Sequence, residues 1–202
     1  MAHEGLWEQL VGLGRQKTAV RAKCQYLSDQ ECYVITMLNT EYTVSLSDKR
    51  IFSVQTSSPP KQARFIEQLC LLAYLINAQD LPPANKLVRA ESLPGGQFFF
   101  RGVHGLPTRK LEEVFGRCPE ALLKAERQLG TKRREFGDAS VELHVLPRIP
   151  LTVVIWGECD EFPARASVLF DQTATAHLPL DALLAAVGLA VDALIKVSEQ
   201  SS

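Results

Sequence analysis

The connection between Trp156 and Asp171 holds the densest group of reactive side chains in the sequence. It contains three carboxylates, one thiol and one guanidinium: Glu158, Asp160, Glu161, Cys159 and Arg165. A carboxylate could act as an acid–base group, and the guanidinium could bind an anion. Neighbouring residues of an extended segment point to opposite sides, so Asp160 and Glu161 do not form a carboxylate pair by themselves. The simpler alternative is a charged hairpin loop in which Arg165 pairs with one of the acids.

Two of the four histidines lie where a ligand could reach them. His104 follows the aromatic run Phe98-Phe99-Phe100 and is flanked by glycines, and His177 directly precedes a Leu-Pro pair. Such a histidine can ligate a metal or bind a flat cofactor, or it can hydrogen-bond the backbone of a turn. We expect His3 in the N-terminal segment and His144 on the solvent face of a strand.

Other residues argue against familiar catalytic chemistry. The chain has no phosphate-binding loop, no Gly-x-Ser-x-Gly and no His-Glu-x-x-His, and Gly12-Leu13-Gly14 lacks the third glycine of a dinucleotide site. Acidic neighbours disfavour the thiolate of Cys159, which counts against a nucleophile. The five cysteines include no Cys-x-x-Cys pair, so we expect free thiols in a reducing cytosol.

The elements that must position these side chains follow from hydrophobic periodicity. We expect a helix over residues 3–23, weakened by two glycines, and then a three-stranded meander over 33–38, 42–46 and 51–54. Ser57 to Pro60 is expected to lead into a central apolar helix over 61–78. Phe98 to Phe100 predicts a segment covered on both faces, or a lid.

The second half of the chain alternates short helices and strands. Helices are expected over 107–115 and 119–129, a hairpin over 134–145, strands over 151–156 and 167–170, and a C-terminal helix over 180–197. Asp171 ends a strand, where its side chain is expected to cap the next helical turn. The fold class is therefore α+β, with antiparallel hairpins packed on a central apolar helix and a C-terminal helix. We expect one domain over 1–202, with a helix and meander in 1–57, a helical middle in 58–130, and strands with the C-terminal helix in 131–202.

Composition restricts the class of protein. The 202 residues carry 22 basic and 23 acidic side chains, and hydrophobic residues make up 46%, values typical of a globular chain and not of a disordered one. Nucleic-acid binding is not expected, because the pI is about 6.4 and the one dense basic run is Lys132 to Arg134. No apolar stretch approaches the ~20 residues of a membrane span, and no signal sequence is apparent. We therefore expect a cytoplasmic protein that contacts neither nucleic acid nor membrane.

Several short motifs resemble those of an uncharacterised prokaryotic domain family. They are Leu93-Pro94-Gly95-Gly96, Phe115-Gly116, Phe136-Gly137-Asp138, the run 146–150, Trp156-Gly157, the run 160–163, Leu169-Phe170-Asp171 and His177-Leu178-Pro179. The resemblance runs from about Tyr33 to the terminal helix. Members are found largely in anaerobes, and some carry a cysteine-rich iron–sulfur domain that this chain lacks. The resemblance implies an anaerobic redox or tetrapyrrole setting and transfers no catalytic residue.

Three hypotheses result. The first is a cytosolic, non-enzymatic binding or accessory module for a metal-containing or tetrapyrrole cofactor. Its predicted site consists of two ligands, two aromatic walls and two carboxylates that orient the ligands: His104, His177, Phe99, Trp156, Asp160 and Asp171. The second is an interaction module that binds a partner protein without a cofactor. The third is a hydrolase-like enzyme in which Asp160 or Glu161 is the acid–base group and Arg165 binds an anionic substrate.

Overall fold

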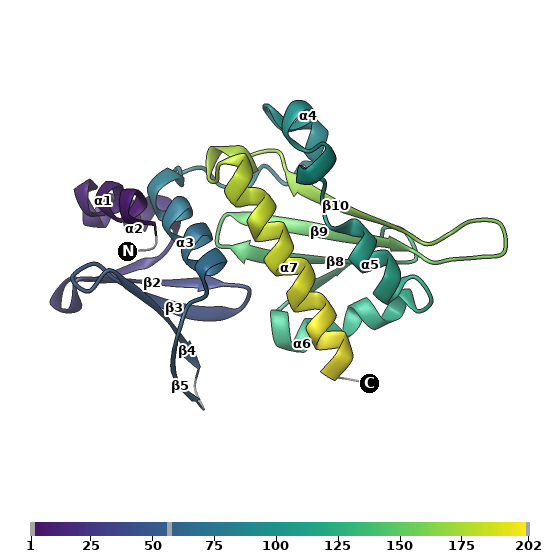
Figure 1. Cartoon of the computed structure of the whole chain (residues 1–202), viewed down its shortest axis with the longest axis horizontal. Helices are drawn as coiled ribbons and strands as arrows, with labels where there is room; N and C mark the ends of the chain where they lie inside the picture. Colours follow the sequence, from purple (N-terminus) through teal and green to yellow (C-terminus); the bar gives the residue numbers. More distant parts are fainter. Residues whose placement is uncertain (1–2, 56–57, 201–202) are drawn as a thin grey trace.

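The computed structural model describes residues 3–55 and 58–200, which form helices and two five-stranded antiparallel sheets (Figure 1). The N-terminal sheet follows chain order, β1-β2-β3-β4-β5, and the C-terminal sheet has the order β6-β10-β9-β8-β7. In the second sheet a meander of four strands is completed by β6, which comes from earlier in the chain. The predicted α+β class is confirmed.

The N-terminal sheet contains the predicted meander. Its strands are β1 (Gln25–Leu27), β2 (Cys32–Met37), β3 (Thr40–Ser45), β4 (Arg50–Gln55) and β5 (Ser58–Gln62). Leu38 and Asn39 turn β2 into β3 with φ of 48° and 59°, as a tight hairpin requires. The expectation that the prolines lead directly into a helix was wrong: Pro59 and Pro60 lie in the edge strand β5, where a proline need not donate to a neighbour.

Helices α1 (Glu4–Gly12), α2 (Arg15–Ala22) and α3 (Phe65–Asn77) accompany this sheet. The single helix expected over 3–23 is instead two, because Leu13 between them is extended (φ −85°, ψ 154°). The flanking glycines have low helix propensity, which favours a break at this point. α3 begins where the Glu67 carboxylate accepts a hydrogen bond from the Arg64 backbone N–H at 2.7 Å.

The C-terminal sheet consists of β6 (Leu87–Arg89), β7 (Lys132–Arg134), β8 (Ala139–Leu146), β9 (Ile149–Trp156) and β10 (Arg165–Asp171). The apolar run of β9 is buried along most of its length, and His144 on β8 is exposed, as predicted. α7 (Leu180–Gln200) lies across this sheet and packs against α3 (Figure 1). Both long apolar helices predicted from periodicity are therefore confirmed.

The segment between β6 and β7 is mostly short helical turns. It contains α4 (Gly96–Phe99), α5 (Thr108–Phe115) and α6 (Glu126–Leu129), with 3-10 turns at Ala90–Ser92, Gly102–His104 and Pro119–Ala125. The three consecutive phenylalanines do not form a strand covered on both faces. Phe98 and Phe99 belong to the helical turn α4 and Phe100 directly follows it; Phe98 is 75% exposed and Phe100 is buried.

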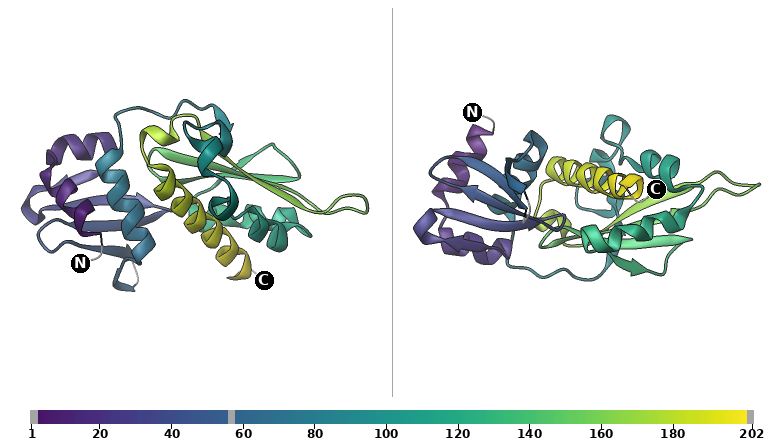
Figure 2. Two further views of the ribbon diagram at one scale, coloured as in Figure 1. Left: turned by 45° about the horizontal axis from the view of Figure 1, so that its top comes forward. Right: turned by 90° about the horizontal axis from the view of Figure 1, so that it is seen from below.

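The two sheets meet at the β2–β3 turn, where the Leu38 N–H donates to the Val145 carbonyl of β8 at 3.1 Å. Buried side chains from both sheets form one continuous core. The β9–β10 hairpin projects beyond this core in both views of Figure 2. Across 3–55 and 58–200, no helix combines the length and apolarity that crossing a bilayer demands.

Candidate functional site

A groove of about 360 Å³ lies along the first half of β10, and we call it the β10 groove. One wall comes from β10, and the other comes from the end of β6 and the turns that follow it. Its lining residues are Arg89, Ala90, Glu91, Phe100, Gly105, Leu106, Thr108, Arg165, Ala166, Ser167 and Val168.

The groove exists because β6 is shorter than β10. β6 pairs only with Leu169 to Asp171, so residues 165–168 have a strand neighbour on the β9 side alone. The chain after β6 returns to this open edge at α5, which packs against β10, and we call residues 90–115 the covering segment. The Glu112 carboxylate of α5 accepts a hydrogen bond from the Ala166 backbone N–H at 3.1 Å, which covers part of the edge and leaves the rest as the groove.

Glycine is required where the covering segment turns. Gly95, the residue before α4, has φ of 75°, a conformation that favours glycine. A Cβ on Gly96 would lie 1.9 Å from the Ala90 carbonyl oxygen, a distance that no side chain tolerates. The Leu-Pro-Gly-Gly motif therefore lets the aromatic segment lie close to the turn after β6.

The β10 groove carries two arginines whose charge is not matched by an ion pair among the described residues. Arg89 and Arg165 are both exposed, and Glu91 is the one carboxylate in the lining. The Arg165 guanidinium lies 5.6 Å from the centroid of the Trp156 ring. A guanidinium beside an aromatic face can still donate its N–H groups to an anion, so the groove suits an anionic group.

The predicted residues Phe99 and His104 lie beside this groove. Their rings are stacked, with centroids 4.7 Å apart and planes inclined by 4°, and the adjoining residues Phe100 and Gly105 line the groove. His104 is exposed, so an incoming ligand can reach its ring. The pair therefore belongs to the segment whose neighbouring residues line the groove, and neither ring lines it.

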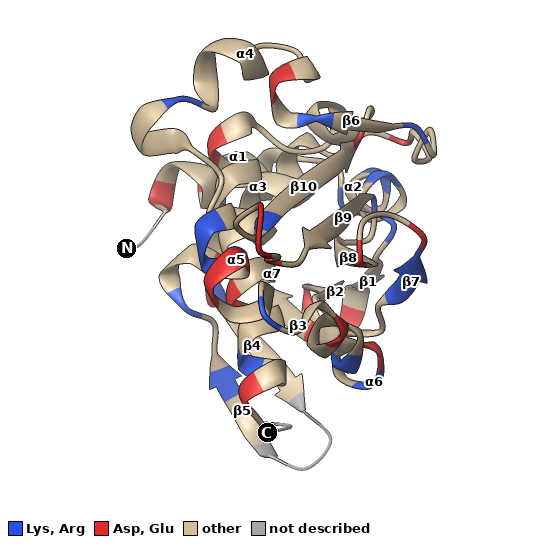
Figure 3. Cartoon of the chain, turned by 90° about the vertical axis from the view of Figure 1, so that its right-hand side faces the viewer, with Lys and Arg blue, Asp and Glu red and all other residues tan. Residues whose placement is uncertain are grey.

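Asp160 lies in the β9–β10 loop, which points toward the viewer in Figure 3. Asp160 and Glu161 are exposed and line neither of the two grooves described. The expected pairing of Arg165 with an acid of this loop is absent among the described residues: Arg165 lies over Trp156, and Glu158 pairs with Arg117 at 3.2 Å.

Asp171 and His177 lie at the other end of β10 and are buried. Asp171 is six positions after Arg165 on the strand, so the two Cα atoms are about 20 Å apart. The Asp171 carboxylate accepts from the N–H and hydroxyl of Thr173 at 2.9 and 2.6 Å and from the Ala84 N–H at 3.0 Å. The predicted helix cap was wrong: Thr173 is the N-cap of the 3-10 turn Ala174–Ala176, which has no side-chain cap. Burial opposes ionisation of this carboxyl, but the hydrogen bonds outweigh it and lower its pKa.

His177 is fully buried beside the same turn. Its Nδ1 accepts from the Gln79 backbone N–H at 3.3 Å, whereas its Nε2 has no partner among the described residues. Burial, and secondarily the nearby Arg148 charge, lowers the pKa of the His177 imidazole. The buried ring is therefore a structural group at this position, whereas the ring of His104 is exposed.

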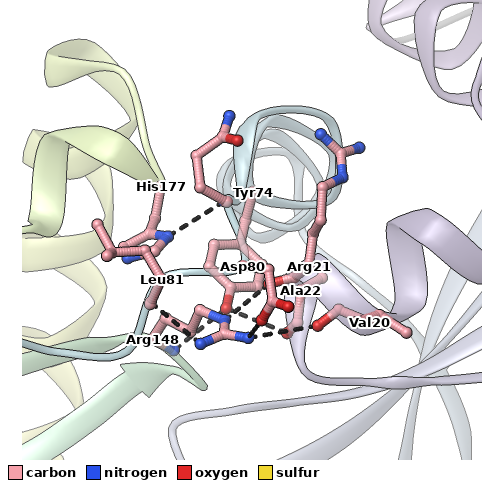
Figure 4. A network of polar contacts seen from close by, with 9 residues as sticks. Val20, Arg21, Ala22, Tyr74, Asp80, Leu81, Arg148 and His177 are labelled. Carbon is pink, nitrogen blue, oxygen red and sulfur yellow. Dashed lines mark hydrogen bonds and ion pairs between the residues drawn. The ribbon is translucent and has the colours of Figure 1, made fainter.

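Sequence reasoning did not identify the polar network around Arg148, which joins the two halves of the chain (Figure 4). Arg148 lies in the β8–β9 turn and is 8% exposed. Its guanidinium donates to the carbonyls of Arg21 at 2.7 Å, Leu81 at 3.0 Å and Val20 at 3.4 Å, and contacts the Asp80 carboxylate at 2.6 Å. The sequence signal that could have revealed this network is the single charged residue, Arg148, within the otherwise apolar run 146–150.

Tyr74 extends this network into the core. Its hydroxyl donates to the Ala22 carbonyl at 3.1 Å and accepts from the Arg148 backbone N–H at 3.1 Å. Arg148 and Tyr74 thus satisfy the last carbonyls of α2, which have no partner inside the helix. The network fixes the β8–β9 turn against α2 and α3.

A second groove, of about 460 Å³, lies at the β7–β8 turn and is lined by residues 133–139. Several of its polar groups already have partners. Arg134 pairs with Glu142 at 3.6 Å and lies 5.8 Å from the Phe136 ring centroid, and the Asp138 carboxylate accepts from the Gly157 N–H at 2.7 Å. The six residues of the predicted cofactor site line neither groove. We regard the β10 groove as the better candidate although it is smaller, because its two arginines form no ion pair among the described residues, whereas Arg134 does.

The described residues contain no group of three histidine, cysteine or acidic side chains arranged to hold a metal ion. The five cysteines are free, and they do not converge. Burial raises the pKa of the Cys24 and Cys70 thiols to about 12, so these two are unreactive thiols, whereas Cys118 and Cys159 are exposed.

Comparison with known proteins gives one match. The profile of a family described as a domain of unknown function, DUF3786, matches residues 15–193. No curated protein and no solved structure matches the chain. The matched region includes both sheets and the β10 groove, and the chain belongs to the DUF3786 family.

Proposed function

We propose that this chain is a non-enzymatic binding module that holds an anionic, flat cofactor at the β10 groove. The observation that carries this proposal is the pair Arg89 and Arg165, which line one groove without an ion-pair partner among the described residues. Guanidinium groups form bidentate hydrogen bonds with carboxylates and phosphates. A ligand with two acidic groups would engage both arginines.

A tetrapyrrole is the cofactor class that we favour. It is planar and bears carboxylates, and the aromatic residues Phe99 and His104 are next in sequence to the groove residues Phe100 and Gly105. The groove volume of about 360 Å³ is at the lower end for ligand sites, so it would receive the acidic groups and one edge of the ring. The family resemblance adds the expectation of an anaerobic, cytosolic setting.

A metal in this module would arrive inside the cofactor, since no three-residue metal site exists among the described residues. His104 would then be the residue that ligates this metal, because it is exposed and adjoins the groove residue Gly105, while His177 is fully buried. Trp156 supports Arg165, and Asp171 and His177 support the fold at the far end of β10.

The hydrolase-like alternative is less favoured by this geometry. Such a site needs Asp160 or Glu161 to converge with Arg165 on a concave surface, whereas both acids are exposed and line neither groove. The interaction-module alternative has one specific observation in its favour. Phe98 and Val103, on the covering segment, are 75% and 94% exposed, which is typical of a contact surface.

The proposal is tested by titrating the protein with protoporphyrin IX and with haemin while recording absorbance. Both should bind the wild-type chain, and replacing Arg89 and Arg165 together by alanine should weaken both by at least about 100-fold, since each lost bond to a charged group costs about 1.5–3 kcal/mol. His104→Ala should change the haemin spectrum and leave protoporphyrin binding intact. Arg50→Ala, which removes an exposed arginine of β4, is the matched control. If neither compound binds, or if the double variant binds as the control does, the proposal is wrong.

A further inference from the structure

The tip of the β9–β10 hairpin is a second feature without a partner in the chain. Asp160, Glu161 and Phe162 form it, and the turn is closed by a hydrogen bond from the Cys159 N–H to the Phe162 carbonyl at 2.9 Å. Phe162 is 66% exposed, and neither acid takes part in an ion pair among the described residues. The tip therefore presents two carboxylates and an aromatic ring to solvent.

The base of the same loop is fixed to the body of the molecule. The Glu158 N–H donates to the Gly116 carbonyl at 2.9 Å, and the Glu158 carboxylate pairs with Arg117 at 3.2 Å. Because these contacts hold the base, the tip is presented in a set direction, away from the core (Figure 2). A projecting, supported hairpin is suited to contact another molecule.

The complementary surface lies at the base of the same hairpin. The β10 groove begins at Arg165, three residues after Phe162, and combines Arg165 and Arg89 with the apolar residues Phe100, Leu106 and Val168. Two acids and an aromatic ring on the tip thus match two arginines and an apolar lining. Complementary charge of this kind steers association and fixes its register.

We propose that the hairpin tip docks in the β10 groove of a second copy of this chain, forming a two-fold symmetric dimer. Because tip and groove are neighbours on one hairpin, a two-fold axis between two antiparallel hairpins brings each tip to the other copy's groove. This inference goes beyond the proposed function, since it assigns the same groove a second, competing occupant. A ligand that fills the groove would release the dimer.

The test is the mass of the protein in solution, measured by sedimentation equilibrium at about 0.02 M and about 0.5 M salt. The wild-type chain should dimerise at low salt and dissociate at high salt. Changing Asp160 and Glu161 to lysine (tip variant), or Arg89 and Arg165 to glutamate (groove variant), should each raise the dimer dissociation constant by about 100-fold or more. A 1:1 mixture of the two variants should associate again, because both contacts of the mixed dimer pair opposite charges.

Association of the mixed variants would also show that both are folded, because an unfolded variant would not bind the other variant. A wild-type chain that stays monomeric at low salt, or a dimer that persists in both variants, would overturn the inference. The porphyrin titration separates this result from the proposed function, because Asp160 and Glu161 lie outside the groove lining. A monomeric tip variant should still bind protoporphyrin IX. If the wild-type chain dimerises but binds no porphyrin, the proposed function is wrong and the dimer inference stands.

Discussion

Replacing Arg148 by alanine should be among the most destabilising single substitutions outside the apolar core. The guanidinium donates to three backbone carbonyls and contacts Asp80. Each carbonyl bond contributes about 1 kcal/mol, and the pair with the exposed Asp80 contributes less than about 1 kcal/mol. The free energy of unfolding should therefore fall by about 3–4 kcal/mol, out of a typical total of about 5–15 kcal/mol.

Urea unfolding measures this change as a shift of the transition midpoint at unchanged slope. Asp80→Ala should cost less than about 1 kcal/mol, because its carboxylate is 64% exposed and Arg148 keeps its carbonyl partners. Arg50→Ala controls for the loss of an exposed arginine. A loss below about 1 kcal/mol for Arg148→Ala, or an equal loss for Asp80→Ala, would refute the assignment of this network as the joint between the two halves.

Three further outcomes are expected. The pKa of His177 lies below its usual 6.5, so below pH 6.5 the unfolded chain binds more protons than the folded chain, and the free energy of unfolding should decline as the pH falls. Urea unfolding at several pH values measures this decline, which should be flatter for His177→Gln. Gly96→Ala places a Cβ 1.9 Å from the Ala90 carbonyl oxygen, so the covering segment must shift and the melting temperature should drop by several degrees. Gly12→Ala is the control, because a Cβ on Gly12 meets no atom within 4 Å. A thiol reagent should label Cys118 and Cys159 quickly and the buried Cys32 and Cys70 only on unfolding, and equal labelling rates in the native protein would contradict the burial.

Long periodic elements could be predicted from the sequence because their signals are local. The run 180–197 places leucines and valines at helical spacing, and the structure contains α7 there. The edge strand β5 was missed because Pro59 and Pro60 disfavour a paired strand, and only the position of β5 at the sheet edge removes that objection. The turn of α4 depends on the approach of Gly96 to Ala90, which no periodicity shows.

The candidate site was less predictable than the fold. Phe99 and His104 were predicted in one site, and their rings stack, but none of the six predicted residues lines the β10 groove. The burial of His177 could not be predicted, because its contact with Gln79 joins residues 98 positions apart. Arg148 was missed because the groups that its guanidinium contacts lie 67 to 128 residues away in the sequence.

The central claim is that the β10 groove receives the acidic groups of a flat ligand. Mapping backbone amide shifts by NMR during a protoporphyrin IX titration tests it most directly. The account predicts that the largest shifts fall on lining amides such as Gly105, Thr108 and Ser167, while Gly137 of the β7–β8 groove stays unchanged. Shifts centred on residues 133–139, or no shifts at saturating porphyrin, would contradict it.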